Sequence, residues 1–342
     1  MCGKQHAAGR GTPGTGGRRS AGFAVLAIAA AACAGRAEEA TGASTSGGTA
    51  GQTTTSSTTS ATSGVTGISG GTLDLLNFAI VGDTRPPNAD DTAGYPTPII
   101  TKIWQDVQAY SPRPAFALTT GDYMFANPTG TQQAPQMALY LGARAAFTNV
   151  VFAAMGNHEC TGATDSNCGP GNKDGTPPNY AAFMTQMMAP LQVTVPYYTV
   201  NVASPTGAWT AKFVFIAGNA WDATQASWFT AELAKPTTYT FVVRHEGTTA
   251  DTAPGVTPSA AIMATSPYTL LLAGHTHTFS YSADEREVIT GNGGAPLSGG
   301  MNYGYVVAQQ RADGAIVFQE FDYMTNAVQQ TFAVEADGTP TQ

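Results

Sequence analysis

The chain has 342 residues, of which 42% are hydrophobic and 11% are charged, so disorder throughout is excluded and one large domain or two modest ones fit its length. The 39 glycines and 21 prolines indicate many turns and a low-complexity segment. Lys and Arg number 15 against 23 Asp and Glu, and the formal charge of −8 disfavours binding of nucleic acid or an anionic membrane through a basic face. An anionic substrate therefore requires a local device, such as a metal ion.

Residues 1–36 are typical of a secretory signal. The basic residues ahead of its apolar run are Lys4, Arg10, Arg18 and Arg19. The run that follows is uncharged, short and rich in alanine, whereas a membrane-spanning anchor needs about 20 apolar residues. The Arg18-Arg19 pair fits either a twin-arginine signal or an ordinary basic region. We therefore expect an exported protein, periplasmic or extracellular.

Cys33 and the segment after it predict a lipid anchor followed by a flexible linker. Cys33 follows three alanines and resembles the lipidated cysteine of a bacterial lipoprotein signal. Residues 37–72 are almost all Thr, Ser, Gly and Ala, and they cannot bury enough apolar surface to offset the entropy of ordering them. This disordered linker would hold a folded domain away from a membrane to which Cys33 tethers it, or act as a solvated spacer in a secreted form.

Residues 73–325 form the predicted folded domain, and residues 326–342 a C-terminal tail. Short apolar runs alternate with longer amphipathic ones, which is the pattern of an α/β domain. The predicted strands are 75–81, 115–119, 150–155, 213–217, 239–243 and 270–273. The predicted helices are 97–110, 135–147, 180–188 and 224–234. After residue 278, alternating apolar residues with glycine turns predict β-structure, so we expect one domain with two sheets.

Polar side chains follow the ends of the predicted strands. They are Asp83, Asp122, Asn157-His158-Glu159, His245 and His275-Thr276-His277. Because ligands bind beyond the carboxyl ends of strands in α/β sheets, these residues should converge on one edge. The Asp, Asn and His side chains suit two divalent or trivalent ions that share a carboxylate. The chain has five histidines, and every one except His6 lies in these motifs, which argues against ordinary structural histidines.

In kind and order, these motifs resemble those of the calcineurin-like metallophosphoesterase family, part of the purple acid phosphatase-like superfamily. The family order is D-x-H, G-D, G-N-H-E/D, a lone His and G-H-x-H. The corresponding segments here are Asp83-Thr84-Arg85, Gly121-Asp122, Gly156-Asn157-His158-Glu159, His245 and Gly274-His275-Thr276-His277. The resemblance covers roughly residues 73–322 and implies a four-layer α/β/β/α sandwich of two mixed β-sheets flanked by helices.

The resemblance also implies a hydrolase of phosphate esters with two metal ions, of which Fe, Mn, Zn or Mg would each suit. The implied ligands are Asp122 as the bridge, Asp83 and His277 for one ion, and Asn157, His245 and His275 for the other. A hydroxide held by the ions would attack phosphorus in an in-line displacement. His158 would stabilise the phosphoryl group or protonate the leaving oxygen. The expected substrate is a phosphorylated small molecule or macromolecule.

Arg85 departs from the family pattern, because it stands where the family has the first histidine. A guanidinium stays protonated and cannot bind a metal, so the ion beside Asp83 has one ligand fewer. Purple acid phosphatases also lack that histidine but supply a Tyr three places after the second Asp, where this chain has Phe125. Two roles stay open for Arg85, a grip on substrate phosphate or an ordinary surface ion pair.

Cys160 and Cys168 are predicted to form a disulfide. In an exported protein, two cysteines eight positions apart are more typical of a disulfide than of a metal pair. Redox catalysis would favour a tighter Cys-x-x-Cys spacing. The bond would staple an irregular, glycine-rich loop after His158.

Two other functions stay open. A nuclease or nucleotide phosphodiesterase would be favoured by a basic groove, which the charge balance does not support. A surface-anchored binding module with a degenerate metal site would explain the departure at Arg85. The complete set of four motif histidines argues against that second alternative.

Overall fold

The computed structural model describes residues 67–250 and 252–342, so the predicted signal segment, Cys33 and most of the predicted linker lie outside the described residues. Two seven-stranded sheets form the centre of the described part. The first has the strand order β1-β5-β6-β7-β8-β10-β9, and the second has the order β14-β13-β12-β11-β2-β3-β4. Both are mixed, because each contains parallel and antiparallel neighbours.

The strands of the first sheet are β1 (Ile68–Thr72), β5 (Tyr198–Ala203), β6 (Thr210–Phe215), β7 (Tyr239–Val243), β8 (Leu270–Ala273), β9 (Phe279–Ser282) and β10 (Glu287–Thr290). Those of the second are β2 (Asn77–Val81), β3 (Phe116–Thr119), β4 (Val151–Ala153), β11 (Gly304–Gln310), β12 (Ile316–Asp322), β13 (Val328–Val334) and β14 (Pro340–Thr341). The α-helices are α1 (Thr97–Ala109), α2 (Gln133–Arg144), α3 (Pro178–Phe183), α4 (Ala223–Leu233) and α5 (Val256–Met263).

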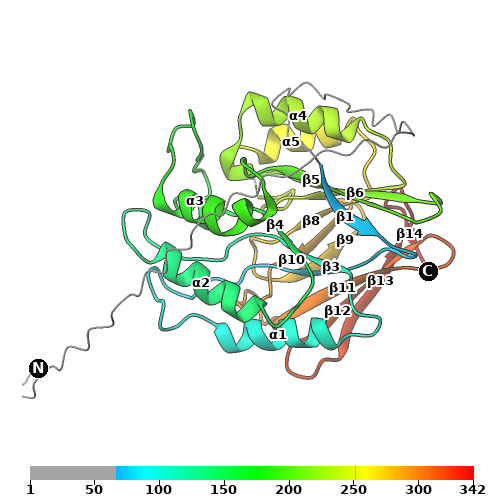
Figure 1. Ribbon diagram of the computed structural model, residues 1–342, viewed down its shortest axis with the longest axis horizontal. Helices are drawn as coiled ribbons and strands as arrows, with labels where there is room; N and C mark the ends of the chain where they lie inside the picture. Colours follow the sequence, from blue (N-terminus) through cyan, green and yellow to red (C-terminus); the bar gives the residue numbers. More distant parts are fainter. Residues whose placement is uncertain (1–66, 251) are drawn as a thin grey trace, which may run out of the picture. The chain divides into compact units, whose positions relative to one another are not determined.

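Helices lie on the outer faces of the two sheets, as Figure 1 shows for α4 and α5 on one side and α1 and α2 on the other. Helix α1 buries Ile100, Ile103, Trp104 and Val107, whose three- and four-residue spacing places them on one helical face. Helix α4 begins after Asp222, whose carboxylate accepts a hydrogen bond of 2.7 Å from the Gln225 amide. The predicted four-layer fold is confirmed.

Three segments differ from the sequence prediction. The segment Ile68–Thr72 lies inside the predicted linker but forms β1, which pairs with β5 at the sheet edge. The predicted tail 326–342 contains β13 and β14, which extend the second sheet. Strand β1 is a polar edge strand, and β13 lies between β12 and the two-residue edge strand β14. Neither has a clear apolar alternation, so pairing with neighbouring strands reveals them. The predicted helix 180–188 is α3 followed by a π-helix at Met184–Met188.

Within residues 67–250 and 252–342, no helix combines the length and the apolar character that crossing a membrane requires.

Phe78 lies at the centre of the core between the sheets. It is fully buried on β2, and its ring contacts Phe116 of the same sheet and Phe213 and Phe241 of the opposite sheet at centroid distances of 5.7, 4.9 and 5.5 Å. Aromatic pairs in these geometries add to the stabilisation from burial. The two sheets are therefore joined by aromatic packing through this ring.

We expect Phe78→Ala to lower the free energy of unfolding by about 3–5 kcal/mol, because it opens a cavity between two sheets that cannot collapse. Urea unfolding followed by circular dichroism measures the change. Met324→Ala is the control, since that side chain is 73% exposed and should change stability by less than about 0.5 kcal/mol. Equal effects of the two substitutions would contradict the central role of Phe78.

Candidate metal centre

The polar residues that follow strands of both sheets meet at one place. Asp83 follows β2 and Asp122 follows β3 in the second sheet, whereas His245 follows β7 in the first. The two aspartate loops are joined directly, because the amide of Thr84 donates to the Asp122 carbonyl at 3.0 Å. The predicted convergence of these residues is therefore seen in the structure.

Four of the predicted ligands have left-handed backbone conformations. The φ angles are 52° for Asp83, 59° for Asp122, 71° for His275 and 53° for His277. Such conformations cost energy in residues other than glycine, and they cluster at functional sites. They turn the chain sharply at the strand ends, so that the side chains point inward rather than continuing along the sheet.

Glycine is required just before two of these residues because the packing is close. A Cβ on Gly274 would lie 2.2 Å from Asp83 Oδ2, and a Cβ on Gly121 would lie 2.7 Å from His245 Nδ1. Gly121 also has a φ of 109°, which strongly favours glycine. The G-D and G-H-x-H motifs thus reflect steric exclusion at the site as well as backbone freedom.

The chemistry of the donor set fits a metal ion. One ligand atom each from Asp83, Asp122 and His245 lie within 4.8 Å of one another, and all three side chains are buried. Two buried carboxylates at this separation repel each other unless a cation or a proton lies nearby. Carboxylate oxygens and imidazole nitrogens are ligands for divalent ions. These three residues could therefore hold at least one metal ion.

The remaining predicted ligands surround this group. Asn157 Oδ1 lies 3.1 Å from His245 Nε2, and His275 Nδ1 lies 3.2 Å from the same nitrogen. On the other side, His277 Nε2 lies 3.5 Å from Asp83 Oδ1. The ligand candidates thus fall into two groups, with Asp83 and His277 on one side and Asn157, His245 and His275 on the other.

Backbone carbonyls orient two of the histidines. The Nδ1 atom of His245 lies 2.7 Å from the Thr120 carbonyl oxygen, and that of His277 lies 2.7 Å from the Pro296 carbonyl oxygen. A carbonyl only accepts, so Nδ1 carries the proton in both rings and leaves Nε2 unprotonated in the neutral imidazole. Metal-binding histidines are typically held in this way by a partner on the other ring nitrogen.

The pKa values of the two aspartates are displaced in opposite directions. Burial, together with the charge of Asp122, raises the pKa of Asp83 well above its usual range. Burial would also raise the pKa of Asp122, but His245, His158 and Arg85 hold it well below the usual range. The two buried carboxylates therefore differ in how readily they ionise, and a bound cation would favour the charged form of both.

Glu159 holds the backbone next to Asp122, a role that was not predicted from the sequence. Its buried carboxylate accepts hydrogen bonds of 2.9 Å from the amides of Asp122, Tyr123 and Gly156. Burial and the charge of Asp122 raise its pKa to about 7. Glu159 thus ties the loop after β3 to the loop after β4. The sequence signal for Glu159 is its place as the last residue of the Gly156-Asn157-His158-Glu159 motif.

His158 and Arg85 lie beside the ligand group on its open side. The Nε2 atom of His158 is 3.8 Å from Asp122 Oδ2, and Arg85 Nε is 3.5 Å from the same oxygen. The ring of Phe125 lies under both, at 4.8 Å from the Arg85 guanidinium carbon and 4.5 Å from the His158 ring centre. Arg85 is only 15% exposed, so it belongs to the site rather than to the outer surface.

An open hollow of about 440 Å³ lies over the centre. Its lining includes Arg85, Asp122, His158, Thr164, Thr276 and Ser298. None of the described residues that line it is Phe, Tyr or Trp. The hollow therefore offers polar and charged contacts to a substrate and no aromatic platform.

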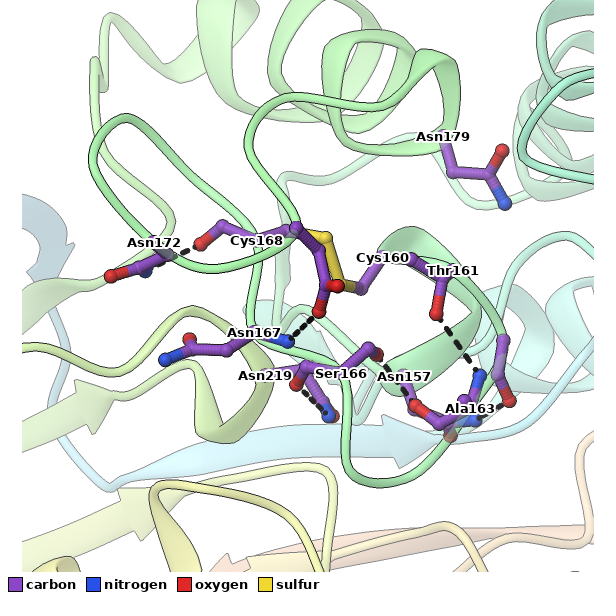
Figure 2. The surroundings of a disulfide bond; sticks show 12 residues. Asn157, Cys160, Thr161, Ala163, Ser166, Asn167, Cys168, Asn172, Asn179 and Asn219 are labelled. Atoms are coloured by element: carbon purple, nitrogen blue, oxygen red, sulfur yellow. Dashed lines mark hydrogen bonds between the residues drawn. A yellow bond between two sulfur atoms is a disulfide. The ribbon is translucent and has the colours of Figure 1, made fainter.

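The predicted disulfide is confirmed, and Gly162 and Thr164 of the loop that it closes line this hollow. Cys160 and Cys168 are bonded and fully buried, and Figure 2 shows the loop between them with Asn157 and Asn219 beside it. Asn179 of α3 also contacts this region, because its Nδ2 donates to the His158 carbonyl at 2.9 Å. Asn179 and Asn219 were not predicted from the sequence, since isolated asparagines belong to no recognisable motif.

Comparison with known proteins identifies related chains. Residues 76–279 match the family described as calcineurin-like phosphoesterase. GAP50, the anchor in the inner membrane complex of Plasmodium, is 13% identical, with 78% of this chain and 90% of that chain covered and a TM-score of 0.57. Purple acid phosphatase PPD1 from yellow lupin (Lupinus luteus) seeds is 14% identical, with 78% of this chain covered, a TM-score of 0.53 and 55% of the lupin chain spanned. These two likenesses show the fold, and no curated protein matches the chain.

We expect Asp122→Ala to lose nearly all bound metal, because this carboxylate lies between the two halves of the ligand group. Metal per chain is measured by mass spectrometry after reconstitution and gel filtration. Asp106→Ala is the control: Asp106 pairs with Lys102 at 2.6 Å on helix α1, away from the site, and should bind as much metal as the wild type. Full metal content in Asp122→Ala would contradict the site.

Proposed function

Since the chain belongs to the calcineurin-like phosphoesterase family, we propose that it is a metal-dependent hydrolase of phosphate esters with a dinuclear centre. The observation that carries the proposal is the buried group of Asp83, Asp122 and His245, whose ligand atoms lie within 4.8 Å of one another. Asn157 and His275 complete one half of the ligand set, and His277 faces the other. Fe, Mn, Zn or Mg would each suit these donors.

The position of Asp122 supports its role as the bridging ligand. Its Oδ1 faces His245 Nε2 at 3.2 Å, whereas its Oδ2 faces Arg85 and His158. The two oxygens thus face different neighbours, so that Oδ1 could serve the ion beside His245 and leave Oδ2 for the second ion. When bound, divalent ions would lower the pKa of a water molecule and neutralise charge on the phosphoryl oxygens.

The surroundings of His158 favour one of its two expected roles. Burial lowers its pKa to about 4, so the imidazole is neutral near pH 7. A neutral imidazole donates a hydrogen bond to a phosphoryl oxygen but is a poor source of a full proton for the leaving oxygen. Its Nδ1 is buried without a hydrogen-bond partner among the described residues. We therefore assign His158 to stabilising the phosphoryl group.

Arg85 is placed to hold the substrate phosphate. Its side chain lines the hollow and rests on the Phe125 ring, beside the Asp122 carboxylate. A guanidinium binds phosphate oxygens through several parallel hydrogen bonds. This location favours phosphate binding over the surface ion pair that the sequence left open.

The hollow favours a phosphate ester without a base-stacking requirement. The described lining of the hollow has no Phe, Tyr or Trp on which a nucleotide base could stack. The binding-module alternative draws support from the fold of GAP50, which is described as an anchor. The ligand group argues for catalysis, because a module that only binds has no need of four histidines in one cluster.

We also propose that the protein is exported and that the linker, which ends before β1 at Ile68, separates the domain from a lipid at Cys33. The support is the sequence pattern of residues 1–36 and the disulfide in the domain, which is typical of oxidising compartments. Partition of the full chain and its Cys33→Ser variant between detergent and water tests the lipid. Equal partition of the two would reject it.

A metal-reconstituted activity screen tests the hydrolase. The purified chain is loaded with Mn²⁺, Zn²⁺, Mg²⁺ or Fe and assayed with aryl phosphate monoesters, aryl diesters and nucleotides. We expect hydrolysis of at least one ester class that depends on added metal and is abolished by a chelator. A chain that binds metal but turns over none of these esters would support the binding module instead.

We expect His158→Ala to reduce kcat by about 10²–10⁴-fold, because a hydrogen bond to the phosphoryl group in the transition state is lost. Metal content should stay at the wild-type level, since His158 is not among the assigned ligands. Steady-state kinetics and metal analysis on the same sample provide both values. A fall in metal content like that of Asp122→Ala would make His158 a ligand.

We expect Arg85→Ala to lower kcat/KM by about 10–150-fold, which corresponds to about 1.5–3 kcal/mol for a charged hydrogen bond to phosphate. Metal content should not fall. Arg85→His is the matched variant: the imidazole would supply the ligand missing beside Asp83, raise metal occupancy and still weaken substrate binding. Unchanged kinetics of Arg85→Ala on every hydrolysed substrate would remove the phosphate role.

A further inference from the structure

The loop closed by the Cys160–Cys168 disulfide does more than border the hollow. We propose that Asn219 and this disulfide are positioning residues for the metal centre, because they hold the loop whose Gly162 carbonyl orients the Asn157 amide toward His245. This inference rests on the proposed function, since Asn157 matters only if it is a ligand. Neither Asn219 nor the disulfide is among the residues assigned above to bind metal or substrate.

Gly162 holds Asn157 by two hydrogen bonds. Asn157 Nδ2 donates to the Gly162 carbonyl at 2.7 Å, and the Gly162 amide donates to the Asn157 carbonyl at 2.9 Å. An amide side chain has one donating and one accepting end. With Nδ2 engaged by a carbonyl, Oδ1 is the end that lies 3.1 Å from His245 Nε2. A flipped amide would place two oxygens against each other, so Gly162 decides which end faces the metal centre.

Asn219 fixes the loop that carries Gly162. It is fully buried in the turn after β6, which belongs to the first sheet. Its Nδ2 donates to the Thr164 carbonyl at 2.7 Å and to the Ser166 carbonyl at 2.9 Å. Its own carbonyl accepts from the Cys168 amide at 2.7 Å. A residue in the turn after a strand of the first sheet thus holds the loop that follows β4 of the second sheet. Figure 2 shows Asn219 beside this loop.

The loop depends on these cross-links because it has little regular structure of its own. After the 3₁₀ turn at Asn157–Glu159, no helix or strand begins in the described chain until α3 at Pro178. Gly162, Gly169 and Gly171 have φ angles of 90°, 110° and 84°. The disulfide and the Asn219 clamp therefore supply the rigidity that a ligand-orienting carbonyl needs. Partners behind a metal ligand typically change metal affinity 10–100-fold when they are removed.

Asn219→Asp tests the clamp with little change in shape. The carboxylate has no N–H to donate to the Thr164 and Ser166 carbonyls, so the loop should loosen and Asn157 should lose its fixed orientation. We expect the affinity for Co²⁺, measured by competition with a chromophoric chelator, to fall about 10-fold. Asn149→Asp is the matched control, because Asn149 Nδ2 also donates to a backbone carbonyl, that of Pro114 at 2.9 Å, outside the 160–168 loop. Its Co²⁺ affinity should equal that of the wild type.

A double-mutant cycle separates positioning from a general loss of structure. If Asn219 acts through Asn157, then Asn219→Asp should weaken Co²⁺ binding in the wild-type background and have no further effect in Asn157→Ala. The visible absorption of bound Co²⁺ should shift in both single variants, because the coordination changes. An equal loss of affinity in both backgrounds, or an unshifted spectrum, overturns the proposal.

Removal of the disulfide provides a second test if Asn219→Asp does not fold. The double variant Cys160→Ser/Cys168→Ser should also bind Co²⁺ about 10-fold more weakly and should show the same dependence on Asn157. Wild-type affinity in this folded variant overturns the role of the disulfide. A wild-type chain that binds no Co²⁺ refutes the proposed function itself, whereas normal binding that neither variant alters refutes only this inference.

Discussion

Two carboxylates, those of Asp83 and Asp122, lie buried side by side where loops from the second sheet meet His245 of the first. Their repulsion is unfavourable unless positive charge is placed between or beside them. His245 and Arg85 lie beside Asp122 and hold its pKa below the usual range, whereas burial raises the pKa of Asp83. A bound metal ion would add positive charge between the two carboxylates and favour the ionised form of both.

Steric constraints follow from this arrangement. The carboxylates approach only because the residues before and beside them have no side chain, as at Gly121 and Gly274. Aspartate and histidine ligands then accept left-handed backbone angles so that their side chains turn inward. The aromatic core around Phe78 joins the sheets that carry these loops, so core packing sets the distance between ligands from different strands.

The residues that hold the ligand loops in place come from segments far apart in the sequence. Glu159 binds the amides of Asp122 and Gly156, and Asn219 clamps the loop that orients Asn157. In these contacts the buried Glu159 carboxylate accepts hydrogen bonds from backbone amides, and the buried Asn219 side chain donates to backbone carbonyls. Breaking any one of them would leave a buried polar group without a partner in addition to moving a ligand.

Much of the fold and of the ligand group could be predicted from the sequence. The strand 239–243 and the helix 97–110 follow from local apolar patterns, and the polar residues at strand ends converge because parallel strands place their carboxyl ends together. The disulfide followed from the spacing of Cys160 and Cys168 and from the expected export. Each of these depends on local sequence and a general rule of topology.

Only the tertiary structure decided the rest. Strands β1 and β13 show no clear apolar alternation and are held in place by pairing with neighbouring strands. The location of Arg85 over Phe125, and the clamp of Asn219 on a loop more than 50 residues earlier, depend on contacts across the fold. The sequence alone determined which side chains are available to bind metal. Packing between the sheets determined which of their atoms face one another, because those distances are set by long-range contacts that no local pattern records.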